Sequence, residues 1–381
     1  MIPILNLTRQ YELLKDPIND ALLRVAASGH YILGPEVKAF EEEMAQYLGV
    51  KHVIGCANGT DALFLALKAL RIGEGDEVIT TPFSYMATSE SIVRAGAKPV
   101  FIDIEPCSMN FDVQLLEAAI TPRTKAILPV HIFGQSANMD EVRRVAKARN
   151  LVVIEDCAQA IGSDFKGQKV GGIGDIGCFS FFPSKNLGCL GDGGMCTTND
   201  DELAERLRML RVHGSRQRYY HEEPGLNSRL DEIQAAVLRI KLKHIDEWNH
   251  ARQAVADRYD ELLKPLAGKY VELPHRHSKG QHVFHQYTIQ LKGSNDPVKL
   301  RAEVQKKLQE AGIQSMIYYP VPLYRQQTHA DLHLNPADYP TCEQISDQVL
   351  SLPMFPELTA GEQQQVADAL IQVLTAIPAH V

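Results

Sequence analysis

The sequence predicts an α/β protein whose sheet is mostly parallel. Short apolar runs rich in β-branched residues alternate with segments of helical periodicity, the order expected of repeated strand–helix units. The runs are apolar throughout, as in strands that helices cover on both faces. With 381 residues, the chain exceeds the size that one hydrophobic core usually serves, so we expect a large domain and a smaller one.

The first part of the chain carries the strand–helix alternation. We predict strands at 52–57, 76–81, 98–104, 125–130 and 151–156, and helices between them at 61–71, 84–96, 111–120 and 138–150. From about 175 to 198 the pattern changes to short strands and glycine turns. One long helical stretch is then predicted from Arg229 to about Leu263.

The C-terminal part has a different pattern and predicts a small α+β domain. A strand is expected at 283–291, a helix at 298–312, a second strand at 313–320 and two further helices. Residues 273–282 are predicted to form a loop. We therefore divide the chain into a large domain, residues 1–249, and a small C-terminal domain, residues 250–381.

Composition argues against several classes of protein. The formal net charge of −8 and the pI near 6.0 disfavour a general affinity for nucleic acid or anionic membranes. No apolar run reaches transmembrane length, and the N-terminal stretch lacks the basic region of a secretory signal. The seven cysteines are scattered without CxxC spacing, which suits reduced thiols. We expect a cytoplasmic protein.

One glycine pattern points to a different chemistry. Gly172, Gly174 and Gly177 match GxGxxG, the fingerprint of an NAD(P)-dependent oxidoreductase. That fingerprint requires a strand before it and a helix after it, whereas here an aromatic run follows and no convincing strand precedes. We keep the oxidoreductase only as a minor alternative.

A group of four histidines has loosely metal-like spacing: His275, His277, His282 and His285. No cysteine or carboxylate set joins them in the sequence. A solvated loop is the simpler interpretation, and we predict no metal site.

Two stretches offer groups that bind phosphate. Asn58, Gly59, Thr60 and Asp61 lie between a predicted strand and a predicted helix, where free backbone N–H groups and a hydroxyl suit an anion. The same residues also make an ordinary helix cap. Ser180 supplies a further hydroxyl at the end of a later run.

Two further positions suit a flat aromatic ligand. Glu155 and Asp156 end a buried strand, where ligands bind in open α/β sheets, although carboxylates also cap helices there. In PFSYMAT, at 82–88, an aromatic residue at the mouth of a sheet can stack on a planar ring. Core packing is the simpler interpretation for Phe83.

Lys185 lies between the aromatic run FSFF and a glycine-rich run. Desolvating an ammonium is costly, so a lysine in such a stretch either keeps its charge in water or serves chemistry. A desolvated lysine becomes a nucleophile toward carbonyls. Together, a phosphate turn, a stacking ring, a strand-end aspartate and a Schiff-base lysine are the parts that bind pyridoxal 5′-phosphate (PLP).

Several longer segments resemble the DegT/StrS-type sugar aminotransferases, a group with the aspartate-aminotransferase-like fold. They include SGHYILGPEVKAFEEEMAQYLGVKH, NGTDAL, EDCAQA, FFPSKNLGCLGDGG, HGSRQRYYHEEPGLNSRLDEIQAAVL and SLPMFP. The resemblance covers nearly the whole chain and rests on the order and spacing of these motifs. It implies the PLP-transferase type I fold, in which a mostly parallel seven-stranded sheet is flanked by helices and a smaller C-terminal α+β domain follows.

The resemblance also implies a role for each matching residue. Lys185 would form the imine with PLP and then move the proton between the cofactor carbon and the substrate carbon. Asp156 would pair with the pyridine nitrogen, Gln159 would lie against the ring, and Tyr85 would stack on it. Gly59, Thr60 and Ser180 would hold the phosphate, with Asn227 reaching it from a neighbouring subunit. The last role implies a homodimer with shared active sites.

The implied reaction is transamination. A dehydratase branch of the family has histidine in place of the lysine, and Lys185 is present here. A ping-pong reaction follows, in which an amino donor, expected to be L-glutamate, makes the pyridoxamine (PMP) form and a nucleotide-linked keto sugar takes the amine. The pathway would make amino sugars, as for polysaccharides or lipopolysaccharide. A PLP-binding regulator without this activity is a second alternative.

The resemblance is strongest to the branch acting on C3 ketones. Two subgroups fit, one using dTDP-linked 3-keto-6-deoxyhexoses and one using UDP-linked 3-keto-N-acetylglucosaminuronate, and we favour the dTDP subgroup. Tyr318 stands where the uronate type has histidine. The 4-keto branch stays an alternative. Four residues are predicted to line the substrate pocket: His213, Arg229, Tyr318 and Tyr319.

Overall fold

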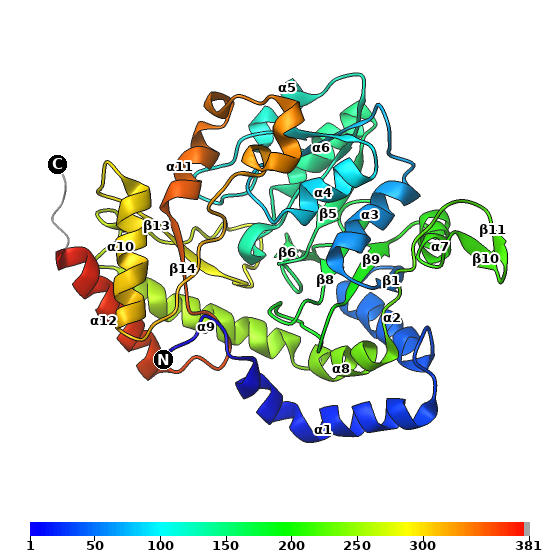
Figure 1. Cartoon of the computed structure of the whole chain (residues 1–381), viewed down its shortest axis with the longest axis horizontal. Coiled ribbons are helices and arrows are strands. Elements are labelled where there is room, and N and C mark those ends of the chain that lie inside the picture. Colours follow the sequence, from blue (N-terminus) through cyan, green and yellow to red (C-terminus); the bar gives the residue numbers. More distant parts are fainter. Residues whose placement is uncertain (377–381) are drawn as a thin grey trace.

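The computed structural model describes residues 1–376, and its centre is a seven-stranded sheet (Figure 1). Six strands run parallel, and β9 alone runs antiparallel to its two neighbours. The predicted mostly parallel α/β sheet is therefore confirmed. In spatial order the strands are β1 (His52–Cys56), β9 (Gly194–Thr198), β8 (Ile176–Ser180), β5 (Val152–Asp156), β4 (Thr124–Ile127), β2 (Glu77–Thr80) and β3 (Lys98–Phe101).

Helices cover both faces of this sheet because successive strand residues point to opposite faces. Ile154 packs in one core cluster with helices α3 and α7, whereas Val153 packs in another with α6. A third cluster lies between the sheet and α2 and α8. The helices of this part are α1 (Leu7–Ser28), α2 (Pro35–Leu48), α3 (Gly59–Ala69), α4 (Ala87–Arg94), α5 (Leu116–Ala119), α6 (Met139–Arg149), α7 (Asp201–Leu210) and α8 (Glu232–Leu242).

A three-stranded antiparallel sheet forms the second structural unit, with its own apolar cluster. Its strands are β12 (Val271–Glu272), β13 (Tyr287–Leu291) and β14 (Val349–Leu352), and its helices are α9 (Ile245–Leu263), α10 (Pro297–Glu310), α11 (Pro340–Gln348) and α12 (Ala360–Ala376). Ile2 from the opposite end of the chain joins this cluster. The proposed domain boundary at 249/250 falls inside α9.

Short elements complete the structure. Two hairpins are formed by β6 (Asp164–Phe165) with β7 (Gln168–Lys169), and by β10 (Ser215–Gln217) with β11 (Tyr220–His221). The 3-10 turns are η1 (Val113–Leu115), η2 (Ile132–Gly134), η3 (Leu323–Arg325), η4 (Gln327–Leu332) and η5 (Pro336–Asp338). The β10–β11 hairpin projects from the end of the molecule opposite the three-stranded sheet (Figure 1).

Three predictions of local structure were wrong. The long helix after Arg229 is two helices, because the chain turns at Lys243–His244 between α8 and α9. The stretch 313–320 forms no strand beyond isolated bridges at Ile313 and Met316, since its apolar side chains pack against the core clusters instead. The histidine loop is only partly solvated, because His282 and His285 are buried.

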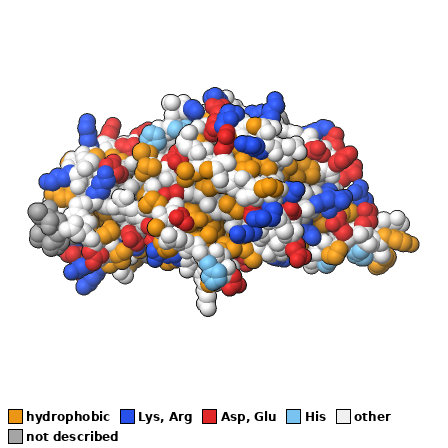
Figure 2. All heavy atoms as spheres, turned by 90° about the horizontal axis from the view of Figure 1, so that it is seen from above, with side chains coloured by type: hydrophobic (Ala, Val, Ile, Leu, Met, Phe, Trp, Pro, Cys, Tyr) orange, Lys and Arg blue, Asp and Glu red, His pale blue; other side chains and the backbone are white. Residues whose placement is uncertain are grey.

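The surface carries charges of both signs. On the face shown in Figure 2, acidic and basic side chains are interspersed, with apolar side chains between them. Within residues 1–376, no helix is long and apolar enough to cross a membrane.

Candidate active site

A cavity of about 690 Å³ opens at the carboxyl ends of the parallel strands. This is where ligands bind in open α/β sheets, since the loops that follow several strands converge there. Nine of the residues predicted for the site line this one cavity: Gly59, Thr60, Tyr85, Asp156, Gln159, Ser180, Lys185, Tyr318 and Tyr319.

The phosphate-binding turn lies where β1 leads into α3. The Asn58 side chain accepts the Asp61 N–H at 2.8 Å and caps the helix. The N–H groups of Gly59 and Thr60 then have no acceptor among residues 1–376 and are free for an anion. A Cβ on Gly59 would lie 2.6 Å from Cβ of Ser180, so only glycine lets the helix start approach β8 this closely.

Asp156 ends β5 at the bottom of the cavity and is buried. Its carboxylate accepts hydrogen bonds from the Thr88 hydroxyl at 2.8 Å and the Ala158 N–H at 3.1 Å. Burial raises the pKa of Asp156 above its usual value, although these hydrogen bonds and the charge of Lys185 act in the opposite direction. A cationic ring nitrogen placed against this carboxylate would relieve that penalty.

Lys185 faces the same cavity from the turn after β8. Burial lowers the pKa of its amine to about 8, while the charge of Asp156 partly offsets this. The turn itself is held tightly. Lys185 donates its backbone N–H to Phe182, and Lys241 of α8 donates to the Gly188 carbonyl at 2.7 Å. About a tenth of this amine is therefore neutral at pH 7, far more than of an ordinary lysine, and this form can attack a carbonyl.

Aromatic and amide groups form the sides of the cavity. Gln159 donates to the Tyr319 hydroxyl at 2.9 Å and accepts the Phe133 N–H at 2.7 Å. Tyr85 lines the cavity with 64% of its surface exposed, whereas Phe83 is fully buried in the core. This difference agrees with the prediction that Tyr85 and not Phe83 is available for stacking.

Three predicted residues do not line the cavity of their own chain: His213, Asn227 and Arg229. All three lie in the segment around the projecting β10–β11 hairpin. The backbone of His213 bonds to Leu226, and Asn227 forms a bridge with Val212. Their assignment to a site therefore depends on a second copy of the chain, and for Asn227 that was the prediction.

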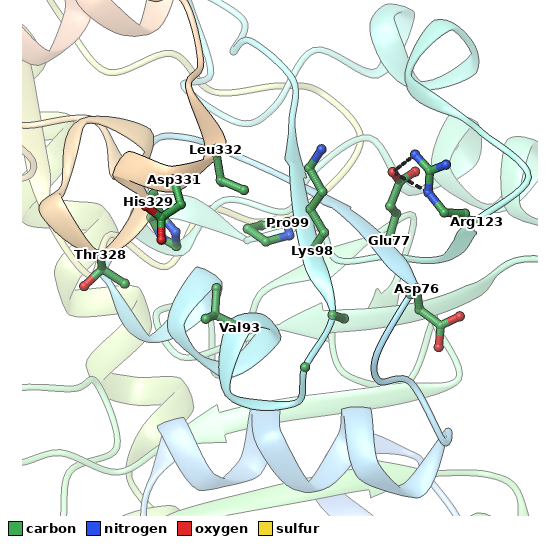
Figure 3. A pocket seen from close by; sticks show the side chains of 13 residues that line it. Asp76, Glu77, Val93, Lys98, Pro99, Arg123, Thr328, His329, Asp331 and Leu332 are labelled. Carbon is green, nitrogen blue, oxygen red and sulfur yellow. Dashed lines mark hydrogen bonds and ion pairs between the residues drawn. The ribbon is translucent and has the colours of Figure 1, made fainter.

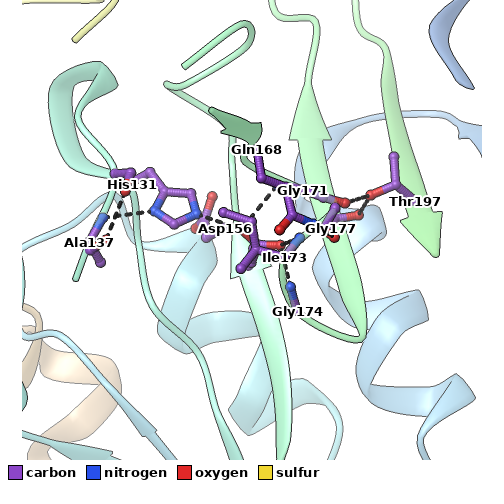
Figure 4. Close-up of polar contacts among 12 residues, drawn as sticks. His131, Ala137, Asp156, Gln168, Gly171, Ile173, Gly174, Gly177 and Thr197 are labelled. Carbon is purple, nitrogen blue, oxygen red and sulfur yellow. Dashed lines mark hydrogen bonds and ion pairs between the residues drawn. The ribbon is translucent and has the colours of Figure 1, made fainter. Parts of the chain in front are cut away.

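The glycine-rich loop at 171–177 binds a carboxylate of the protein itself, that of Glu155, and not a cofactor. Gly171, Ile173 and Gly174 donate their N–H groups to the buried carboxylate of Glu155 at 2.7–3.0 Å. His131 donates from the other side at 3.0 Å (Figure 4). Burial would raise the pKa of Glu155, but these hydrogen bonds lower it below its usual value. The loop thus has a structural role beside Asp156.

His131, Glu155 and Cys157 also lie close enough together to suggest a metal site. The histidine uses both ring nitrogens, because Nδ1 accepts the Ala137 N–H at 3.1 Å and Nε2 donates to Glu155. These internal bonds already explain the cluster without a metal.

A second hollow, of about 340 Å³, lies beside β2 and β3 (Figure 3). Helix α4 contributes Val93 to it and Thr88 to the main cavity. Its buried carboxylate, Glu77, is already paired with Arg123 at 2.7 Å. The combination of a desolvated lysine, a buried aspartate and a phosphate turn belongs to the main cavity.

Sequence reasoning missed several groups that the structure brings to the site. Thr88 was assigned only to a helix, yet it donates to Asp156. His285 was assigned to a predicted strand and to a histidine group without a role, yet it lines the cavity. Neither has a local sequence signal, because each reaches the site through contacts between segments distant in the chain.

A main cavity with this geometry defines a PLP-type aminotransferase site. Residues 13–371 match the DegT/DnrJ/EryC1/StrS aminotransferase family, and the chain belongs to that family. The predicted family and transaminase class are thereby confirmed.

Three relatives span nearly the full chain. The "Pleiotropic regulatory protein" of Geobacillus stearothermophilus is 49% identical over 97% of this chain and 98% of its own. A UDP-N-acetyl-3-dehydro-alpha-D-glucosamine 3-aminotransferase of Acidithiobacillus ferrooxidans is 46% identical over 98% of both. A dTDP-3-amino-3,4,6-trideoxy-alpha-D-glucose transaminase of Streptomyces venezuelae is 43% identical over 97% of this chain and 95% of its own.

Two solved structures are similar along most of the chain. The S. venezuelae DesV structure, in complex with a ketimine intermediate, has a TM-score of 0.93 and 42% identity, covering 97% of this chain and 98% of that one. The Bacillus subtilis ntda structure, with bound PMP, has a TM-score of 0.87 and 33% identity, covering 94% and 82%. The predicted type I fold and PLP cofactor are confirmed by these similarities.

The residues on the cavity wall fit PLP. Gly59, Thr60 and Ser180 would hold its phosphate, Asp156 its ring nitrogen, and Lys185 its aldehyde. Bound there, the cofactor supplies an electron sink for the carbon that gains or loses nitrogen. With the cofactor bound, the buried carboxylate of Asp156 would keep the ring nitrogen protonated, and the amine of Lys185 would move protons to and from the reacting carbons.

Proposed function

We propose that this protein transfers an amino group from L-glutamate to the C3 ketone of a nucleotide-linked sugar. The observation that carries the proposal is the placement of Lys185 and Asp156 on one wall of one cavity, both desolvated. A neutral amine there can accept a proton from the substrate carbon and return it to the other reacting carbon. Two of the relatives described above are named for the sugar position that they aminate, and in both names it is C3.

A regulator that merely binds PLP is the rival function, and one relative is named as a regulatory protein. Binding alone requires no buried amine with a lowered pKa. Because Lys185 is partly buried, lines the cavity and has a lowered pKa, we favour turnover over a binding role.

Among the 3-keto sugars, we place dTDP-linked 3-keto-6-deoxyhexoses first. The support is the resemblance of the segment GSRQRYYHEEPGLNSRLDEIQAAVLRIKL to the deoxysugar enzymes, together with Tyr318 in place of histidine. UDP-linked 3-keto-N-acetylhexosamines or their uronates are the second candidate, because a relative named for a UDP sugar is 46% identical.

We further propose that the working enzyme is a homodimer with shared sites. Lys185 is the only cation among the residues, all within 1–376, that line the cavity of one chain, and Asp61, Glu90 and Asp192 add negative charge. A sugar diphosphate requires cations. Arg229 of a second copy, carried beside the projecting hairpin, would supply one, and Asn227 would reach the cofactor phosphate.

The test is a visible absorption spectrum of the purified protein with PLP, followed through each half-reaction. Glutamate should shift the cofactor band, and a dTDP-linked 3-keto sugar should restore it. Lys185→Ala should not complete this cycle. UDP-linked and 4-keto sugars compared in the same assay decide the substrate, and a requirement for both substrates at once would refute the ping-pong order.

The shared site has its own test. Lys185→Ala and Arg229→Ala proteins, each inactive alone, should recover activity when mixed and allowed to exchange subunits, because one mixed site then has both native residues. If exchange is verified and no activity returns, Arg229 does not act across the interface.

A further inference from the structure

His285 lines the same cavity as Lys185, whose charge acts on it, and the reaction described above does not use it. Its segment is fixed to η2, since Val283 and His285 donate their N–H groups to Gly134 and Phe133, each at 2.9 Å. The ring lines the cavity, and only 6% of the residue is exposed. Because the backbone of His285 is fixed in this way, the groups around its ring decide which ring nitrogen carries the proton.

That state is set by two buried asparagines behind it. Asn249 donates its amide N–H to the Ile161 carbonyl at 3.0 Å, and Asn186 donates to the Val283 carbonyl at 2.9 Å. Backbone carbonyls only accept hydrogen bonds, so both amide groups have their NH₂ ends on these carbonyls. The oxygen of Asn249 then accepts from Asn186 at 2.9 Å, which agrees with this orientation.

The oxygen of Asn186 consequently faces His285. It lies 3.3 Å from Nδ1, and because an amide oxygen cannot donate, Nδ1 must carry the proton. Nε2 is then a bare acceptor. No residue in the described part of the chain, 1–376, donates to Nε2, although the ring borders the cavity.

The charge on the ring is fixed as well. Burial, followed by the positive charges of Lys185 and Arg252, holds the pKa of His285 well below its usual value. Arg252 lies behind the ring and donates to the Phe284 carbonyl at 3.1 Å. His285 therefore stays neutral in the working range, and the lone pair of Nε2 stays available.

We propose that His285 is a positioning residue for Lys185: once Lys185 is protonated during the reaction, its ammonium donates a hydrogen bond to His285 Nε2. In this structure neither the Lys185 amine nor His285 Nε2 has a hydrogen-bond partner among residues 1–376, so each is free to pair with the other. When the C–H bond of the substrate breaks, its electron pair stays with the carbon framework and its proton goes to Lys185. One N–H of the resulting ammonium donates to Nε2, which keeps the amine aimed at the reacting carbons until the proton is returned.

This inference rests on the proposed transaminase function, and two substitutions separate its parts. His285→Gln keeps an amide oxygen near the position of Nε2, whereas His285→Asn keeps the contact with Asn186 but is too short to reach Lys185. The matched control is His282→Gln, since His282 is also buried and neutral in the same segment but lies outside the cavity.

The kinetic test uses 2-deuterated L-glutamate in single turnovers of the PLP-loaded proteins. We expect His285→Asn to lose about 100-fold in the limiting single-turnover rate constant, with little change in the glutamate concentration that gives half of it, because a mispositioned base slows proton transfer. Its deuterium isotope effect should rise above the wild-type value. His285→Gln should recover most of the rate, within about fivefold of wild type, because an acceptor is restored. His282→Gln should leave the isotope effect unchanged.

A direct test needs no turnover. In ¹⁵N-histidine-labelled holoenzyme, with the His285→Gln spectrum as the assignment, the ¹⁵N shifts should show a protonated Nδ1 and a bare Nε2. A proton on Nε2, or an imidazolium, would overturn the proposal, as would equal losses in the Asn and Gln variants with an unchanged isotope effect. If wild-type enzyme does not use glutamate, the proposed donor is wrong, and the NMR measurement still decides the state of His285.

Discussion

Gly59→Ala perturbs the phosphate-binding turn at one atom. The added Cβ would lie 2.6 Å from Cβ of Ser180 and 3.2 Å from its Oγ. Carbon atoms pack at about 3.5–4.0 Å, so α3 and β8 must separate by about 1 Å at this point. Gly59, Thr60 and Ser180 all contribute to the phosphate site, and the separation would break its geometry.

The expected loss of PLP affinity follows from the steric overlap between the new Cβ and Ser180. Adding a methyl group to a close-packed contact costs about 1–3 kcal/mol. If the cofactor must bind against that strain, its Kd rises roughly 5- to 140-fold, since 1.4 kcal/mol corresponds to a factor of ten. Phosphate contacts carry much of this loss, so pyridoxal without phosphate should bind the variant and the wild type almost equally.

The assay is a PLP titration of apo-protein, followed by absorbance. Gly73→Ala is the matched control, because its Cβ would meet only the Ala95 carbonyl at an ordinary 3.4 Å. The control should bind PLP like the wild type. Unchanged PLP affinity in Gly59→Ala would refute the assignment of this turn to the phosphate.

Three further predictions concern stability and cofactor contact. Burial lowers the pKa of Lys185 from 10.5 to about 8, so apo Lys185→Met should be more stable than wild type by roughly 3 kcal/mol at pH 7. The unfolded chain binds more protons between those two pKa values, so wild-type stability rises with pH there. In urea denaturation the gap should shrink to less than about 1 kcal/mol by pH 10, and a gap independent of pH would contradict this. Glu155→Gln should lower the free energy of unfolding by at least about 1–3 kcal/mol in the same assay, because a buried N–H group loses its acceptor. The control Glu272→Gln, on the surface, should lower it by at most about 1 kcal/mol. Phe83→Ala should lower stability by about 3–5 kcal/mol, while Tyr85→Ala should leave stability nearly unchanged and weaken PLP binding roughly 2- to 10-fold; equal stability losses in the two would show that the cavity wall is misassigned.

The local chemistry of the site was predictable from sequence because its parts lie next to strand ends. Asp156 follows an apolar run, and the turn at Asn58–Gly59 separates a strand from a helix, so both had to lie at the carboxyl edge of a parallel sheet. The lysine in an aromatic and glycine-rich stretch indicated a desolvated amine, and Lys185 is partly buried in the cavity with a lowered pKa.

Helix and strand boundaries failed where tertiary packing overrides periodicity. Nothing in RIKLKHIDEW signals a stop, yet α8 ends before His244 because α8 packs against α1 and α2 while α9 packs in the small-sheet cluster. The apolar stretch 313–320 looked like a strand, but Tyr319 serves the cavity by accepting from Gln159.

The sequence by itself determined the fold class, the lysine, the aspartate and the phosphate turn, because each depends on residues adjacent in the chain. Only the tertiary structure decided that the glycine pattern binds Glu155, that Thr88 supports Asp156, and that His285 lines the same cavity as Lys185. These hydrogen bonds join residues 16 to 68 positions apart, and His285 and Lys185 are 100 positions apart. A hydrogen bond depends on distance in space, and local patterns of hydrophobicity and turn residues do not encode which distant segments meet.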